Sequence, residues 1–314
     1  MVKSDWAFRM TNPPRMLPAT RTYLVPLPLC ALRVMEAGDG PPMVIVPATI
    51  SELENWDALI QFMAQWFRVY FFELPGHGQS TPFKQKFTCE LVAETVEQLV
   101  DHIGARRFNL MGFSFGGILA MTTFRRLHAR IDRVTFMAPC LTSRAVMLSP
   151  IQKWIAQWFS RLLGTPRFRS FMLHVIHHPY SRGLLVTFMR IVGRVENPRS
   201  LDDKISHMDD SIMDVIACEL KDILNANFSP PAVIHQTPCY FAMSSRDPLL
   251  DYQTTLAELE RHFSNVHILK LNYPFHQPPR PFTFEELNRD FGTTVNLFLA
   301  EPLEVPAHHQ RDVS

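Results

Sequence analysis

The sequence contains few cysteines, and their arrangement suggests neither cross-linking nor metal binding. Only five cysteines occur among 314 residues, and no two of them form a C-x-x-C pair. An odd and scattered set argues against both a disulfide scaffold and a zinc site. We therefore expect buried, reduced thiols and a cytoplasmic protein.

Long apolar runs and an excess of charge of one sign are also lacking. No stretch of about 18 uncharged apolar residues occurs, so we expect no membrane-spanning helix. Asp5, Arg9 and Arg15 interrupt the first residues, which does not fit a secretory signal. The formal net charge is +1, which gives no electrostatic reason to expect a nucleic-acid partner.

Motifs that hold phosphates or metals are missing as well. Neither G-x-G-x-x-G nor G-x-x-x-x-G-K-S/T is present, so we expect no nucleotide cofactor. His174, His177 and His178 form a small cluster. No carboxylate or cysteine accompanies them at ligand spacing, so we expect no metal ion.

What the sequence does have is an alternation of strand and helix patterns. Apolar residues make up 46% of the chain, enough for a substantial core. Strand patterns cover residues 20–27, 29–36, 43–46, 68–72, 108–111, 133–139, 238–243 and 266–271. Helical patterns cover residues 55–66, 89–103, 117–124, 252–263 and 284–299. This alternation predicts an α/β fold, with a mostly parallel central sheet and helices on both faces.

The alternation stops in the middle of the chain. From 140 to 228 only helical patterns occur, which indicates a helical cap or lid inserted into the core. We therefore expect an α/β core formed by residues 21–139 and 229–300. A Pro-rich N-terminal extension, 1–20, and a polar C-terminal tail, 301–314, complete the predicted organisation.

The segment Gly112–Gly116 reads G-F-S-F-G and lies between a strand pattern and a helical pattern. In this setting a G-x-S-x-G pentapeptide forms a tight, strained turn that presents its serine at a helix N-terminus. Negative charge that develops there is stabilised by the helix dipole. The alternative is a Gly-rich turn with a capping serine.

Further landmarks follow in order along the chain. Trp56 follows the strand at 43–46, and the segment Glu73–Ser80 reads E-L-P-G-H-G-Q-S, similar to a D-x-P-G-H-G-x-S turn with Glu in place of Asp. Asp247 ends a late strand, and His276 follows the last strand. Over residues 20–300 the chain thus resembles the α/β-hydrolase superfamily, and in particular its capped serine hydrolases.

The resemblance implies a catalytic triad of Ser114, Asp247 and His276, in the family's order. A serine hydroxyl needs a base to take its proton, a histidine titrates in the right range, and a carboxylate orients the imidazole. Asp251 is the rival acid. His267 is the rival histidine, but it lies inside a strand pattern.

The resemblance also implies an oxyanion hole. One donor is expected to be the backbone N–H of Phe115, and the other is the N–H of Thr49, with Ala48 in reserve. Here the chain departs from the family, because Pro47-Ala48 stands where His-Gly is usual. Pro47 has no N–H and cannot donate.

These residues together predict a cofactor-independent serine hydrolase that resembles the carboxylesterases. It is expected to cleave a carboxylic ester with an apolar acyl or alcohol part through an acyl-enzyme. Hydrolysis of a carbon–carbon bond, a lactone or a thioester remains open. So does a non-catalytic ligand-binding protein with the same fold, because fold does not imply function.

The cap segment Ile151–Leu163 is sharply amphipathic. The first interpretation is that its apolar face packs on the protein's own core; the second is that it lines a pocket or rests on lipid. Residues 141–200 contain nine Lys and Arg but only Glu196 as an acid. This bias leaves open a peripheral contact with an anionic membrane, or pairing with the aspartates at 202–214.

Overall fold

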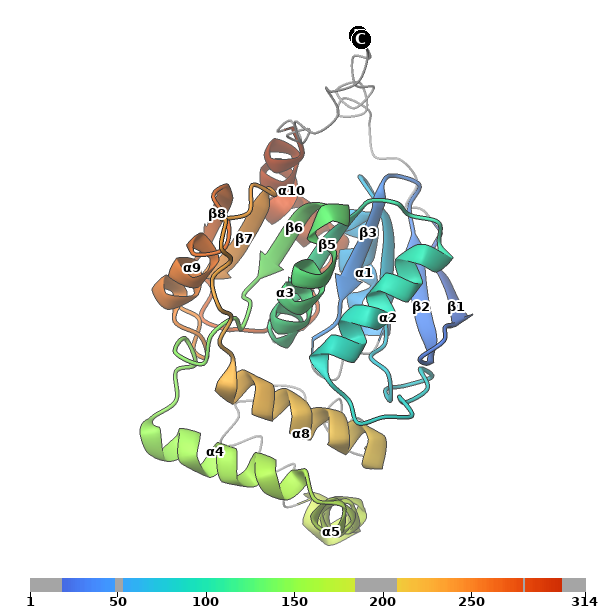
Figure 1. Cartoon of the computed structure of the whole chain (residues 1–314), viewed down its shortest axis with the longest axis vertical. Coiled ribbons are helices and arrows are strands. Elements are labelled where there is room, and N and C mark those ends of the chain that lie inside the picture. Colours follow the sequence, from blue (N-terminus) through green and yellow to red (C-terminus); the bar gives the residue numbers. More distant parts are fainter. Residues whose placement is uncertain (1–18, 49–52, 184–207, 279, 301–314) are drawn as a thin grey trace.

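The computed structural model describes residues 19–48, 53–183, 208–278 and 280–300. These residues form an eight-stranded sheet in the order β1-β2-β4-β3-β5-β6-β7-β8 (Figure 1). The strands are β1 (Arg21–Pro26), β2 (Ala31–Ala37), β3 (Pro42–Val46), β4 (Arg68–Phe72), β5 (Phe108–Phe113), β6 (Ile131–Met137), β7 (Cys239–Ser244) and β8 (Val266–Leu271). The first two strands form an antiparallel hairpin, and β2 also pairs antiparallel with β4. All pairs from β4 to β8 are parallel, which confirms the expected α/β fold with a mostly parallel central sheet.

The burial of the strands follows from their sequences. The central strands β3, β4 and β5 are nearly continuous apolar runs and are buried along most of their length. Such runs are typical of parallel strands covered on both faces. The last strand, β8, has two polar residues, His267 and Lys270, among its apolar ones and lies half-exposed at the edge of the sheet.

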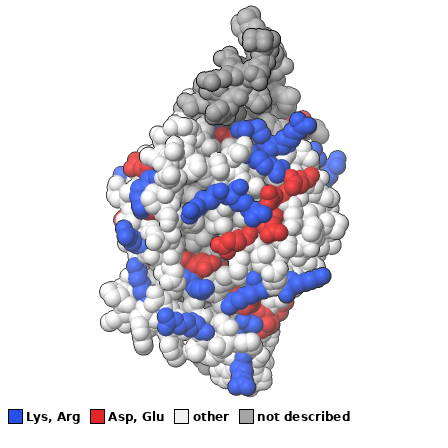
Figure 2. Space-filling model, in the orientation of Figure 1, with Lys and Arg blue, Asp and Glu red and all other residues white. Residues whose placement is uncertain are grey.

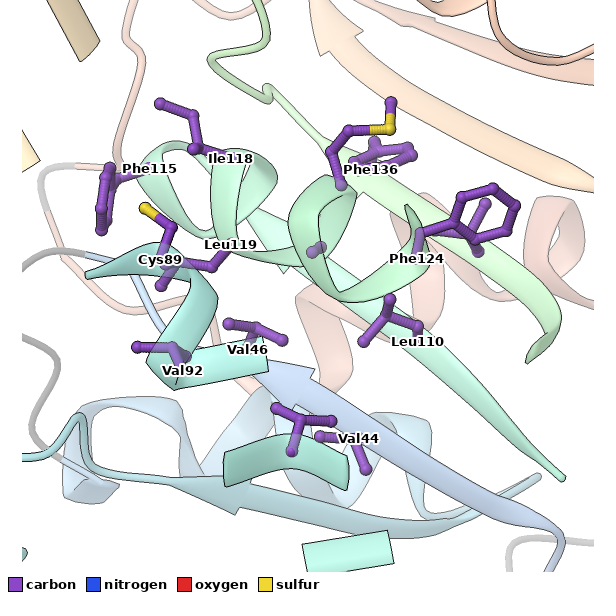
Figure 3. Packing of buried hydrophobic residues seen from close by; sticks show 14 of the residues in the cluster. Val44, Val46, Cys89, Val92, Leu110, Phe115, Ile118, Leu119, Phe124 and Phe136 are labelled. Carbon is purple, nitrogen blue, oxygen red and sulfur yellow. The ribbon is translucent and has the colours of Figure 1, made fainter. Parts of the chain in front are cut away.

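Helices cover both faces of the sheet. On one face lie α2 (Cys89–His102), α3 (Phe115–Leu127) and α9 (Tyr252–Glu260). On the other lie α1 (Asp57–Met63), which follows a 3-10 turn at Leu53–Trp56, and α10 (Phe284–Ala300). Figure 3 shows how side chains of α2 and α3 interdigitate with those of β3, β5 and β6. This packing holds α3, and with it the turn at its N-terminus, firmly against the sheet.

Between β6 and β7 the described residues form helices and no strand, and three of these helices are described over their whole length. They are α4 (Pro150–Leu163), α5 (Pro166–His177) and α8 (Asp210–Asn225), and they lie beyond the carboxyl ends of the strands (Figure 1). Ser149 begins α4 with a capping box, and the side chain of Asp209 caps α8. The helix α8 lies nearest the sheet, and α4 packs on α8.

The orientation of α4 corrects our first interpretation of its apolar face. Ser160 and Leu163 are buried, and the Ser160 hydroxyl donates a hydrogen bond to the Ala217 carbonyl oxygen of α8 at 3.2 Å. The most apolar side of the helix points outward instead, with Ile151, Trp154, Ile155 and Trp158 all at least 50% exposed. The small Ser160 side chain allows close approach to α8, so the helix packs through its less apolar side.

The ends of the chain are only partly described. The predicted tail, 301–314, and residues 1–18 of the predicted extension lie outside the described residues. Within the part that is described, no helix is long and apolar enough to cross a membrane.

Candidate active site

The G-x-S-x-G segment forms a sharp turn between β5 and α3. Strand β5 ends at Phe113, α3 begins at Phe115, and Ser114 between them has φ 53° and ψ −118°. Positive φ is strained for a non-glycine residue, by about 1–3 kcal/mol, and is found where the surrounding structure enforces it. The strained turn places the Ser114 side chain at the carboxyl edge of the sheet, at the N-terminus of α3.

The glycines of this turn are required by close packing. A Cβ atom at Gly112 would lie 2.3 Å from the carbonyl oxygen of Gly116. A Cβ at Gly116 would lie 2.7 Å from the Val46 carbonyl oxygen, and one at Gly117 would lie 2.5 Å from the Cβ of Pro139. The backbones of β3, β5 and α3 therefore approach so closely that no side chain fits between them.

Three predicted residues are brought together at this edge by hydrogen bonds. His276 Nε2 lies 2.7 Å from Ser114 Oγ, and His276 Nδ1 lies 2.6 Å from Asp247 Oδ2. The three residues follow β5, β7 and β8, so parallel strands bring them to one edge. The His276 ring also stacks on Phe113 at 5.5 Å between ring centroids, which restricts its orientation.

The Asp247 carboxylate is almost completely buried and fully hydrogen-bonded. While Oδ2 contacts His276, Oδ1 accepts hydrogen bonds from the backbone N–H groups of Leu249 and Leu250 at 2.8 and 3.0 Å. Burial by itself raises the pKa of Asp247, but the His276 contact and the two backbone hydrogen bonds together lower it below its ordinary value. Asp247 is therefore an anion at neutral pH, oriented toward the imidazole.

The two rival residues have other partners. The side chain of Asp251 caps α9 by accepting a hydrogen bond from the Thr254 N–H at 2.8 Å. His267 lies within β8 and packs against Phe298. Neither contacts Ser114 or His276.

The expected oxyanion donors are only partly described. Phe115 is the first residue of α3, and the first N–H groups of a helix have no acceptor within the helix. Thr49 lies outside the described residues, so its predicted role stays a prediction. Ala48, the reserve donor, is buried and lines the cavity described below.

The Glu73–Ser80 turn has a structural role. Glu73 is buried and accepts hydrogen bonds from Arg33 Nη1 at 2.8 Å and from the Gln79 N–H at 2.7 Å. Gly78 has φ 53°, and a Cβ there would lie 2.4 Å from Glu73 Oε2. The longer Glu side chain thus stabilises the turn from within, where the resembling family usually has Asp.

His77 lies in the same turn and is uncharged. It is buried, and both ring nitrogens lack a hydrogen-bond partner among the described residues. Burial lowers its pKa to about 4, and Asp209 offsets this only in part. A neutral imidazole at this position contributes packing beneath α8.

A cavity of about 250 Å³ lies beside the His276–Asp247 pair. It lies between the carboxyl edge of the sheet, α1, α10 and the loop that carries His276. Its wall includes aromatic side chains from segments far apart in the sequence, namely Trp56, Phe113, Tyr273, Phe275 and Phe282, together with aliphatic and polar residues. The volume is slightly below the range typical of small-molecule sites, about 300–1,000 Å³.

The sequence interpretation did not identify these wall residues as a group. Trp56 is a landmark after the strand at 43–46, and Phe113 belongs to the serine motif. What they share is position along the chain, because each lies within seven residues of a predicted catalytic residue or an expected oxyanion donor.

The histidine cluster near the end of α5 is exposed. His174 and His178 have ring centroids 6.4 Å apart. Throughout the described ranges, no group of three or more His, Cys, Asp or Glu side chains is arranged to hold a metal ion.

Comparison with known proteins places this geometry in context. A family model described as the alpha/beta hydrolase fold matches residues 41–266. The dihydrolipoyllysine-residue acetyltransferase component of the acetoin cleaving system of Pseudomonas putida is 29% identical over 127 residues, which is 40% of this chain and 34% of that protein. The pimeloyl-(acyl-carrier protein) methyl ester esterase of Nitrosomonas europaea is 26% identical over 122 residues, 37% of this chain and 45% of that enzyme. Each match spans less than half of the relative's length.

Solved structures resemble the chain over most of its length. A membrane phospholipase A described as a bacterial virulence factor superposes with a TM-score of 0.63 and 15% identity, covering 89% of this chain and 86% of that one. At this level of identity the likeness shows the fold alone.

Proposed function

Because the chain belongs to the alpha/beta hydrolase fold family, we propose that it is a serine hydrolase with Ser114, His276 and Asp247 as its catalytic triad. The observation that carries the proposal is the hydrogen-bond chain from Ser114 Oγ through His276 to Asp247. A nucleophile, a base within hydrogen-bond distance and a third group that orients the base are the arrangement that activates a serine.

The proposed reaction proceeds through an acyl-enzyme. Ser114 Oγ attacks the carbonyl carbon while His276 Nε2 takes the hydroxyl proton, and the carbonyl π electrons move to oxygen. The tetrahedral intermediate collapses, the bond to the alkoxy group breaks, and His276 returns the proton to the departing alcohol. Water, deprotonated by His276, then attacks the acyl carbon, and Ser114 leaves with the proton.

Asp247 acts through His276 in this scheme. Its carboxylate accepts a hydrogen bond from Nδ1–H, which leaves Nε2 free of a proton and facing Ser114. The same negative charge stabilises the imidazolium that forms during the reaction. The stacking of His276 on Phe113 supports this orientation from the side.

The negative oxygen of the intermediate needs donors at the turn. We propose the backbone N–H of Phe115 as one donor and that of Thr49, or Ala48 in reserve, as the other. Loss of one such donor costs about 3–4 kcal/mol in related chemistry. Because the proposed donors are backbone N–H groups, the presence of Pro47-Ala48 where the family usually has His-Gly is compatible with catalysis.

For the substrate we propose a carboxylic ester with a compact apolar acyl or alcohol part, that is, a carboxylesterase-like activity. The aromatic cavity beside His276 supports an apolar group there, and its volume favours a small one. The matched relative from Nitrosomonas europaea is an ester hydrolase, which also supports this bond type.

The proposal is tested by hydrolysis of p-nitrophenyl esters of increasing acyl chain length by the protein and by Ser114→Ala. We expect activity with short and medium chains and its loss in the variant. A folded protein that hydrolyses a thioester, a lactone or a carbon–carbon bond but no carboxylic ester contradicts the substrate proposal. A folded protein with no hydrolase activity supports ligand binding instead.

We also propose a cytoplasmic location. All five cysteines are free and buried, and burial raises the pKa of Cys30 to about 11. Unpaired, unreactive thiols are typical of a reducing compartment.

A further inference from the structure

An exposed apolar surface runs along the outer side of α4. Ile151 is 71% exposed and Trp154 is 65% exposed, and Ile155 and Trp158 are each at least half exposed. These four positions follow the spacing i, i+3, i+4 and i+7, which places them on one side of the helix. On α5, Phe171 is also exposed. We call the four α4 residues the outer apolar face.

This face is the most apolar side of α4, yet it is the side turned away from the protein. The opposite side packs on α8 through Phe159, Leu163 and Ser160, and Ser160 hydrogen-bonds to Ala217. Amphipathic helices usually bury their apolar side. The helix buries Ser160 and Leu163, yet it leaves two tryptophans and two isoleucines exposed on its outer side. An exposed apolar patch of this kind marks a site that contacts another apolar surface.

The two helices that carry these exposed apolar residues, α4 and α5, bear basic residues and no acid. Residues 141–183 contain six Arg and Lys and no acid. Of these, Arg169 forms ion pairs with Asp210 and Asp214. Arg161 and Arg167 are exposed and form no ion pair within the described ranges. Figure 2 shows several Lys and Arg side chains, some Asp or Glu side chains and much uncharged surface at the lower end of the molecule, where α4 and α5 lie.

The position of α4 relates this face to the rest of the molecule. The helix lies on the outer side of α8, beyond the carboxyl edge of the sheet where Ser114 and His276 lie (Figure 1). A surface that touches α4 therefore lies on the same end of the molecule as the candidate active site.

We propose that the outer apolar face of α4 binds the surface of an anionic lipid bilayer. Tryptophan rings and isoleucine side chains enter the boundary between headgroups and acyl chains, and Arg161 and Arg167 contact lipid phosphates. Tryptophan is enriched at this boundary in membrane proteins, and neighbouring basic residues strengthen binding to anionic lipid. The inference rests on the surface alone and does not depend on the proposed hydrolase activity.

A second copy of the chain fits this surface less well. A two-fold dimer through α4 would bring each basic surface against its own copy, since the same patch is used on both subunits. Arg161 and Arg167 would then face like charges without an acid in residues 141–183 to pair with. A bilayer with anionic headgroups supplies the opposite charge that this surface lacks.

The experiment is sedimentation of the full-length protein with vesicles of phosphatidylcholine alone or with 30% phosphatidylglycerol, a fraction chosen to be roughly that of an anionic leaflet. The test variant is Ile151→Glu/Ile155→Glu, which keeps both tryptophans as fluorescence reporters. The control variant is Val233→Glu/Leu297→Glu, which introduces the same charge at two other exposed apolar positions. Circular dichroism checks that both variants are folded.

We expect the protein and the control variant to bind the anionic vesicles at low salt, with a blue shift of tryptophan emission. The test variant is expected to bind about tenfold or more weakly, and salt at about 0.5 M should release the protein because it screens the charges. The proposal would be overturned if the protein did not bind anionic vesicles at low salt, or if the test and control variants bound equally. It would also be overturned if the protein and the control variant formed a dimer, the test variant did not, and none of them bound vesicles.

Discussion

His276 Nε2 lies 2.7 Å from Ser114 Oγ, although the two residues are separated by 162 positions in the sequence. The contact depends on a strained turn after β5 and on a loop after β8, two segments that only the parallel sheet brings together. Asp247 completes the chain from a third strand end. Each part of this arrangement has consequences that are open to measurement.

The Asp247–His276 hydrogen bond predicts a large effect of a small change. Asp247→Asn keeps the shape but offers a donor where the imidazole needs an acceptor, which favours the wrong tautomer. We expect kcat to fall about 10⁴-fold, as in other triads. The matched control is Asp251→Asn, because Asn caps helices as well as Asp does. Equal rates for the two variants, measured on the best ester, would contradict the assigned role.

The lowered pKa of Asp247 predicts a pH dependence of stability. In the unfolded chain this carboxyl titrates near its ordinary value of 3.8. The ionised group therefore stabilises the fold above about pH 4, and this contribution is lost as the pH falls through the lowered folded-state pKa. Urea unfolding of the protein and of Asp247→Asn between pH 7 and pH 3 measures the effect. The difference in unfolding free energy between the protein and Asp247→Asn should shrink as the pH falls. A constant difference would refute the predicted contribution of the Asp247 carboxylate.

The ion pair between Arg33 and Glu73 predicts unequal effects of two similar changes. Arg33 contacts both Glu73, which is buried, and Glu54, which is exposed. Glu73→Ala leaves a partly buried guanidinium without its inner partner and should cost about 3–5 kcal/mol of unfolding free energy. Glu54→Ala removes only a surface contact and should cost about 0–1 kcal/mol. Chemical denaturation decides, and similar losses for both variants would disprove the structural role of Glu73.

The close packing at the serine turn predicts that its glycines cannot be replaced. In Gly112→Ala the new methyl group would lie 2.3 Å from the Gly116 carbonyl oxygen, so the turn must shift. We expect a loss of several kcal/mol in stability, at or above the range of about 1–3 kcal/mol for overpacking, and loss of ester hydrolysis. At Gly183 a new Cβ would meet no heavy atom within 4 Å in the part of the chain that the structure describes, so Gly183→Ala serves as the control. Thermal unfolding of both variants gives the comparison.

The cavity beside His276 predicts how substrate size can be changed. Leu59 lines this cavity, and Leu59→Trp should fill part of it. We expect the preferred acyl chain to become shorter, with KM rising for longer esters while kcat for the shortest ester is kept. The control is Leu297→Trp, which adds the same ring at an exposed position. An unchanged chain-length profile would show that the acyl group binds elsewhere.

Much of the fold was predictable because its signals are local. The apolar runs of β3 and β4 and the G-F-S-F-G turn determine the alternation and the position of Ser114. The order of motifs also indicated Asp247 and His276 before their contacts were known. These predictions succeeded because parallel strands must end at one edge of a sheet, whatever lies between them in the sequence.

The features that sequence alone did not predict depend on packing between distant segments. The amphipathic pattern of 151–163 identified the helix but not which side it buries, and the side chosen depends on the fit of Ser160 against α8. The aromatic cavity is likewise assembled from the segments around Trp56, Phe113 and Tyr273, which no single motif contains. Periodicity indicates that a face is apolar, whereas only the packed structure shows what lies against it.

The central claim is that Ser114 is an activated nucleophile, and the most direct measurement is its covalent labelling by a fluorophosphonate probe. The labelled residue is identified by peptide mass spectrometry, with Ser114→Ala and unfolded protein as controls. The account predicts labelling of the folded protein at Ser114 and none in either control. A folded protein that stays unlabelled at Ser114 would contradict it.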